Sequence, residues 1–136
     1  MAPVRGTQQT TDPSPFQYAI VRVVPRVERG ECVNAGVVLF CRPRRFLAAR
    51  VELDEARVRA IAPDADLDAV RGHLQAMRRI AAGDREAGPI AALPASERFH
   101  WLVAPSSTII QCSPVHTGLS DDPEGELEHL MARLVR

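Results

Sequence analysis

The sequence predicts an α+β fold: a mainly antiparallel four- to five-stranded sheet with two to three helices packed on it. The first observation is a pair of apolar runs, residues 18–24 and 33–41, joined by a charged connection that contains Pro25 and Gly30. The second is that two later segments repeat apolar residues every three or four positions, as amphipathic helices do. The predicted order is β-β-β-α-α-β-β-α, in which neighbouring strands pair.

The run at residues 33–41 is the predicted centre of the sheet. Residues 35–41 are apolar at odd and even positions alike, so both faces of this strand are expected to be buried. Gly36 inside the run predicts a β-bulge or a close approach of another backbone segment. Arg22 departs from the apolar first run, and its guanidinium needs a carboxylate or carbonyl groups nearby, or must reach past the sheet edge.

Three elements follow the central pair. Residues 46–53 alternate in polarity and predict a half-exposed third strand. Asp54 suits the N-cap of a short helix at residues 55–62, and Asp64 or Asp66 that of a second helix ending at Gly83. An apolar stripe runs along this second helix: Leu67, Val70, Leu74, Met77 and Ala81.

The C-terminal third contains a connector at residues 82–95, two predicted strands at 98–103 and 107–113, and a final helix. Asp121 or Asp122 caps that helix and Pro123 occupies its first position. The predicted core draws on most of these elements: Ile20, Val21, Val23, Val37, Val38, Leu39, Leu74, Trp101, Leu127, Leu130 and Leu134.

Length and composition predict one domain, residues 16–136, after a disordered polar tail at residues 1–15. The three cysteines are odd in number and widely spaced, with no paired metal or redox motif. The chain shows no signal peptide and no membrane span. A reduced cytoplasmic protein that does not insert into a membrane is therefore expected.

The net charge is zero, although the first fifty residues hold eight Arg against three acids. Aromatic residues make up only 4% of the chain, too few for a platform on which bases stack. A nucleic-acid partner is therefore not expected, and a homodimer is compatible with the sequence.

Two polar segments interrupt the apolar pattern, and they supply most of the candidate binding residues. Residues 28–36 precede and open the central strand, and residues 111–118 follow the last predicted strand. Arg98, near Trp101, is a further candidate outside these two segments. The full set is Glu31, Asn34, Arg98, Ser113 and His116. They fit either a solvated turn with a structural histidine or a cleft that holds a ligand.

The sharpest expectation is that the two polar segments meet. Pro114 should end ladder pairing, so that His116 turns over the end of the sheet and hydrogen-bonds to Glu31 or Asn34. Burial of the imidazole would then separate a structural role from a role at a pocket mouth.

Signals for catalysis are weak. Cys112 and His116 have the spacing of metal ligands on one helix face, but Pro114 between them argues against a helix. A serine near His116 lacks the strained turn of a nucleophile elbow. No catalytic residue, metal site or cofactor is predicted.

Three segments carry a family resemblance: YAIVRVVPRVERGECVNAGVVLFC, IIQCSPVHTG and DDPEGELEHLMARLV. On these, most of the chain from Tyr18 onward resembles an uncharacterised bacterial family, the domain of unknown function numbered 3037. Its members look like small stand-alone proteins, sometimes encoded beside a HipA-like kinase, which implies a partner-binding role. The matching residues transfer as site candidates without assigned roles: Glu31, Asn34, Gly36, Ser113, Pro114, His116 and Gly118.

The leading functional hypothesis is a non-enzymatic protein-binding or regulatory module whose partner is a protein, in one version a kinase-like protein. The alternative is a small enzyme or a nucleotide- or anion-binding protein with a polar site near Glu31, Asn34, Arg98 and His116. Whether these four residues gather in one cleft separates the two hypotheses.

Overall fold

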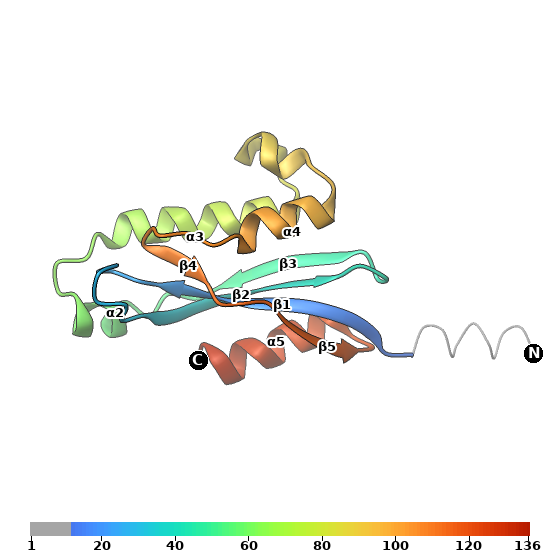
Figure 1. Cartoon of the computed structure of the whole chain (residues 1–136), viewed down its shortest axis with the longest axis horizontal. Coiled ribbons are helices and arrows are strands. Elements are labelled where there is room, and N and C mark those ends of the chain that lie inside the picture. The colour runs from blue at the N-terminus through green and yellow to red at the C-terminus, as the bar shows by residue number, and fades with distance from the viewer. Residues whose placement is uncertain (1–11) are drawn as a thin grey trace, which may run out of the picture.

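The computed structural model describes residues 12–136, which form three layers (Figure 1). An antiparallel sheet lies between α3 and α4 on one face and α5 on the other. The strands are β1 (Ser14–Val23), β2 (Val33–Cys41), β3 (Phe46–Val51), β4 (Ile110–Cys112) and β5 (His116–Ser120). The α-helices are α2 (Glu55–Ile61), α3 (Leu67–Ala82), α4 (Ala95–Val103) and α5 (Pro123–Leu134), and two 3₁₀ turns are η1 (Arg85–Ala87) and η2 (Pro89–Ala92).

The predicted α+β class with its antiparallel sheet is confirmed, and the described residues form four α-helices where two to three were predicted. Most of the predicted tail, residues 1–11, lies outside the described residues. β1 begins at Ser14, four residues before the apolar run that predicted it, residues 18–24.

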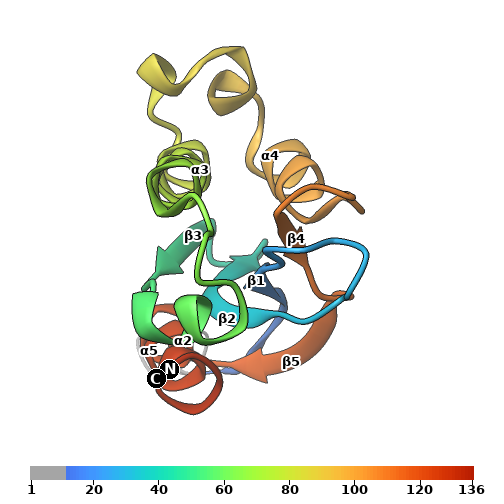
Figure 2. The same cartoon turned by 90° about the vertical axis from the view of Figure 1, so that its left-hand side faces the viewer.

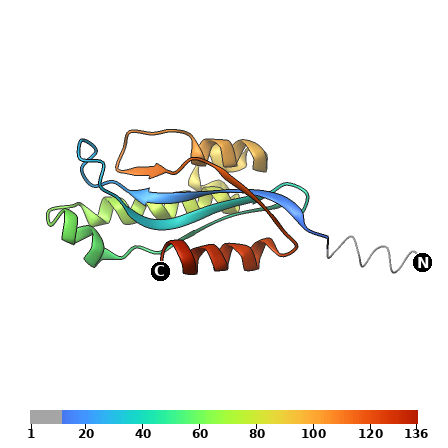
Figure 3. The same ribbon diagram turned by 60° about the horizontal axis from the view of Figure 1, so that its bottom comes forward.

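The sheet is built around β2 and β1. Its order is β3-β2-β1, and the far edge of β1 is shared by two short strands. β4 pairs with residues 21–23 of β1 and β5 pairs with residues 14–18 (Figure 3). β2 therefore lies inside the sheet, as its apolar sequence predicted, and its side chains are buried on both faces.

The predicted irregularity at Gly36 is present in both of its expected forms. The β1–β2 register passes from Val21 opposite Gly36 to Arg22 opposite Asn34, so Ala35 is the extra residue of a β-bulge. A Cβ at Gly36 would lie 2.5 Å from the backbone oxygen of Arg50 on β3. Only glycine allows the two strands to approach this closely.

Two hydrophobic cores result, one on each face of the sheet. The larger packs α3 and α4 on residues such as Val21 and Val38, and the smaller packs α5 on residues such as Leu39. Nine of the predicted core residues are buried: Ile20, Val21, Val23, Val37, Val38, Leu39, Leu74, Leu127 and Leu130. Leu134 is half-buried, and the prediction for Trp101 is wrong because its side chain is 51% exposed.

The helix boundaries follow the predicted capping chemistry. The carboxylates of Asp54, Asp66 and Asp122 each accept a hydrogen bond from a first-turn backbone N–H at 3.1 Å. Gly83 ends α3 with φ of 76°, the left-handed conformation for which glycine is suited. Local sequence alone therefore determines where these helices begin and end.

The prediction of a strand at residues 98–103 is wrong, because this segment forms most of α4. Phe99 and Leu102 are buried three residues apart, which is helical spacing, and Trp101 lies between them on the exposed side. The high β-propensity of Phe, Trp and Val in a short run concealed this periodicity.

The last two strands also differ from the prediction. β4 spans three residues rather than the predicted 107–113, and β5 was missed. The predicted upper count of five strands thus agrees with the structure because one wrong strand offsets one missed strand. Each error falls on a short segment, where periodicity carries little information.

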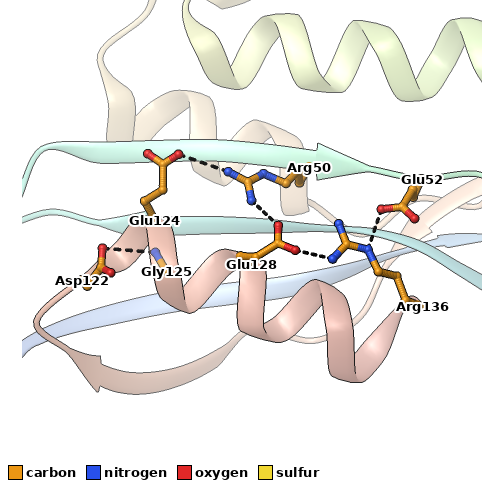
Figure 4. A network of polar contacts seen from close by, with 7 residues as sticks. All are labelled: Arg50, Glu52, Asp122, Glu124, Gly125, Glu128 and Arg136. Carbon is orange, nitrogen blue, oxygen red and sulfur yellow. Dashed lines mark hydrogen bonds and ion pairs between the residues drawn. The ribbon is translucent and has the colours of Figure 1, made fainter.

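An ion-pair network joins α5 to β3 and to the residue that follows β3 (Figure 4). The Arg50 guanidinium lies 2.6 Å from Glu128 and 3.2 Å from Glu124. Arg136 bridges Glu128 and Glu52, the latter at 2.8 Å. These side chains are partly solvated, so each pair is weak alone, but together they orient α5 on the sheet.

Candidate functional site

Each residue that the sequence nominated for binding has a structural contact of its own. The Asn34 side chain donates to the backbone oxygen of Leu134 at 2.9 Å, which satisfies a free carbonyl at the end of α5. Arg98 donates to the carbonyls of Leu93 at 2.7 Å and Ala81 at 3.4 Å, the latter in the last turn of α3. A cation at that position also complements the helix dipole.

Glu31 and His116 lie at the surface. Glu31 forms an exposed ion pair with Arg29 at 2.7 Å, and the hydrogen bond and charge of that guanidinium lower the pKa of Glu31. The imidazole of His116 stacks against Tyr18 with the ring centres 5.2 Å apart. Neither residue faces a shared cleft.

The predicted contact between His116 and the Glu31–Asn34 corner is wrong. His116 pairs with Tyr18 on one edge of β1, and Asn34 pairs with Arg22 on the other edge. Four residues of extended β1, about 13 Å, separate these two positions along the strand. Pro114 does interrupt the ladder, but pairing resumes at once in β5.

Arg98 lies in the helical layer opposite the one that Asn34 contacts. The four residues of the proposed polar cleft are therefore dispersed. Ser113, the fifth candidate, is only 3% exposed, and its hydroxyl accepts from the Ile20 N–H and donates to the Pro114 carbonyl. Its role is structural.

A different residue, Arg22, lacks the partner that the sequence demanded for it. No residue among 12–136 accepts a hydrogen bond from its guanidinium or forms an ion pair with it, and its Nε is buried without a partner. The Nε of Arg98 is also unpaired, but the other nitrogens of that side chain are bonded to carbonyls. Arg22 has no such compensation within the described residues.

Arg22 lines a cavity of about 260 Å³ at the β4 edge of the sheet. The walls come from β1, β4, the loop between β1 and β2, and the loop that precedes β4. Figure 2 shows both loops on the same side of the molecule. The polar lining comprises Arg22, Ser106, Ser107 and Gln111, together with the thiols of Cys32 and Cys112.

The cavity is positively charged, because its lining contains Arg22 and neither Asp nor Glu. Burial raises the pKa of Cys112 to about 11, despite the opposing charge of Arg22, so this thiol stays neutral near pH 7. The lining therefore offers the Arg22 guanidinium and the Ser107 hydroxyl, whereas the Gln111 carboxamide already donates to the Thr108 carbonyl at 2.9 Å and the Ser106 hydroxyl bonds to that of Thr108. Such donors bind carboxylate or phosphate oxygens.

Sequence reasoning missed this site, although it found the signal. Arg22 stood out as a charge on an apolar strand that required a partner. Which loops would enclose it could not be read from the sequence, because the walls come from segments some eighty residues apart.

Among residues 12–136, no group of three or more His, Cys, Asp or Glu side chains is arranged to hold a metal ion. No helix in the described part of the chain combines the length and the apolar character needed to span a bilayer.

A family model described as "Protein of unknown function (DUF3037)" matches residues 18–135. No curated protein and no solved structure matches the chain.

Proposed function

The chain belongs to the DUF3037 family of proteins of unknown function, and we propose that it is a non-enzymatic binding module. Its site is the cavity at Arg22, which receives an anionic oxygen group, a carboxylate or a phosphate, from the ligand. One observation carries the proposal: Arg22 lines a cavity, and its guanidinium has no acceptor among the described residues.

A buried hydrogen-bond donor that has no acceptor costs free energy of folding. A buried N–H without an acceptor destabilises a folded protein by about 1–3 kcal/mol, so native structures rarely contain one without a reason. Arg22 carries such an N–H and also a full positive charge. An anion that accepts from the other nitrogens of the guanidinium offsets the cost of the buried charge through charge-assisted hydrogen bonds.

The composition of the lining supports binding rather than catalysis. It holds no His, Asp, Glu or Lys that would serve as a general base, and the Cys112 thiol is protonated near pH 7. The partner is proposed to be a cytoplasmic protein, and a kinase-like partner is the version that the family resemblance favours.

The experiment is an NMR titration of the ¹⁵N-labelled protein with inorganic phosphate and, separately, with acetate. The backbone amides of Ser107 and Gln111 are expected to shift and to saturate. Arg22→Gln is expected to abolish saturation. Arg85→Gln is the matched control, because Arg85 is exposed, its side chain makes no hydrogen bond or ion pair among residues 12–136, and it lies outside the cavity lining.

A second variant tests the proposal even if Arg22→Gln fails to fold. Gln111 lies directly opposite Arg22 in the β1–β4 register, so Gln111→Glu supplies an internal carboxylate within reach of the guanidinium. The variant loses the hydrogen bond from Gln111 to the Thr108 carbonyl, which the new ion pair with Arg22 offsets, so it is expected to melt near the wild-type temperature and to lose anion binding. Equal saturation in wild type and Gln111→Glu, or no saturation in wild type, overturns the proposal.

A further inference from the structure

A second cavity, of about 280 Å³, adjoins the Arg22 cavity. It lies between α3, α4 and β4, and its lining is mostly apolar, including Met77, Trp101, Leu102 and Ile110. Ser106 and Cys112 line both cavities, so the two openings share a wall. Figure 2 shows α4, β4 and the β1–β2 loop on one side of the molecule.

Trp101 marks this second cavity as unusual. Its indole is 51% exposed although it borders an apolar recess, whereas Phe99 two residues earlier is fully buried. Tryptophan and arginine are the residue types most enriched among those that dominate binding energy at protein interfaces. Here an exposed Trp and an unpaired Arg border two adjoining cavities.

From this arrangement we propose that the two cavities together bind one extended peptide segment of a partner protein. An aliphatic side chain of that segment enters the Trp101 cavity, and a carboxylate three or so residues away reaches Arg22. This inference rests on the proposed function, because it assigns the anionic group at Arg22 to an acidic side chain of the partner.

A peptide is the proposed ligand because a positively charged cavity lies directly beside an apolar one. The cavity at Arg22 is positive and the cavity at Trp101 is apolar, so the ligand must carry an acidic group and an apolar group on a short connector. Ser106 and Cys112 line both cavities, so the two lie next to each other, and three residues of extended chain span about 10 Å. A peptide provides this connector together with backbone donors and acceptors for the hydroxyls of Ser106 and Ser107.

The experiment uses blocked hexapeptides of serine and glycine with leucine at the second position and glutamate at the fifth. Trp101 is the only tryptophan of the chain, so its emission and its quenching by acrylamide report directly on the apolar cavity. The peptide is expected to shift Trp101 emission to the blue and to reduce quenching. Replacing its glutamate by glutamine, or its leucine by alanine, is expected to weaken binding at least tenfold.

Protein variants separate the two cavities. Trp101→Ala has no tryptophan, so its peptide binding is followed by the ¹⁵N amide titration; it is expected to weaken at least tenfold while phosphate still saturates the Ser107 and Gln111 amides. Gln111→Glu is expected to weaken peptide binding and to abolish phosphate binding, and Arg85→Gln to change neither.

The outcomes distinguish this inference from the function on which it rests. If phosphate saturates the Arg22 cavity but the leucine-to-alanine peptide binds as well as the parent, the peptide inference is overturned and the anion site stands. The same holds if Trp101 emission does not respond to a peptide that binds. If neither phosphate nor peptide binds, both proposals fail.

Discussion

The hydroxyl of Ser113 accepts a hydrogen bond at 2.8 Å from the backbone N–H of Ile20, where the edge of the sheet passes from β4 to β5. Val21 and Tyr18 are three positions apart on β1, whereas their partners Cys112 and His116 are four positions apart. The extra residue breaks the regular ladder, and Pro114 has no N–H to offer. The Ser113 side chain takes the place of the missing backbone acceptor.

Ser113→Ala is therefore expected to destabilise the protein by about 1–3 kcal/mol, because the buried Ile20 N–H loses its acceptor. Urea denaturation followed by circular dichroism measures the change. Ser107→Ala is the control, since Ser107 is exposed and its side chain makes no hydrogen bond among the described residues. Equal unfolding midpoints for the two variants would contradict this role.

The placement of residues 98–103 in a helix predicts opposite consequences for two neighbouring aromatic residues. Phe99→Ala is expected to cost about 3–5 kcal/mol because its side chain is fully buried. Trp101→Ala is expected to cost clearly less than Phe99→Ala, because about half of the Trp101 surface is already exposed. Chemical denaturation of both variants tests this, and a loss for Trp101→Ala as large as that for Phe99→Ala would contradict the exposed placement of Trp101 on α4.

Gly36→Ala is expected to destabilise the sheet by about 1–3 kcal/mol, because the added methyl group would lie 2.5 Å from the Arg50 backbone oxygen. Gly72→Ala is the matched control within α3. A Cβ there meets nothing within 4 Å, so alanine should stabilise the helix by about 0.5–1 kcal/mol. Thermal melts should move in opposite directions, and a shift of the same sign in both would count against the bulge geometry.

The network in Figure 4 predicts an acid-sensitive attachment of α5. The hydrogen bond from Arg136, followed by that from Arg50, lowers the pKa of Glu128 below its ordinary 4.5. The unfolded chain then binds the proton more readily, so this contribution is present above pH 4.5 and is lost as the pH falls through the lower folded pKa.

Glu128→Gln removes that contribution, so its stability should fall less than that of wild type between pH 7 and about pH 3.5. Urea midpoints at the two pH values measure the difference. Glu126→Gln, on the same helix but without an ion pair among residues 12–136, should behave as wild type. Identical acid sensitivity of wild type and Glu128→Gln would show that the ion pairs of Glu128 do not stabilise the fold.

The three cysteines should differ sharply in reactivity. Cys32 is exposed, Cys41 is buried, and burial raises the pKa of Cys112 to about 11. Because the thiolate is the nucleophile, iodoacetamide at neutral pH is expected to modify one thiol per folded chain, at Cys32. Mass spectrometry locates the label, and rapid labelling of Cys32→Ser would show that Cys112 is more open than the structure indicates.

The sequence by itself determined the local features of this protein. Apolar runs identified β2 and most of β1, and capping residues such as Asp54, Asp66 and Gly83 marked the ends of helices. Gly36 predicted a bulge or a close approach of another backbone segment, and in the structure that segment is β3. These features depend on residues that lie next to one another in the chain, so their physical causes are visible in sequence.

Only the tertiary structure decided which polar residues are free to bind. Asn34, Arg98 and Ser113 are occupied by carbonyls or an N–H that belong to other elements of the fold. Arg22 needed a partner by its sequence context, and the structure shows that no described residue provides one. The satisfaction of a polar group depends on which distant segments pack beside it, and that long-range packing is absent from the local pattern.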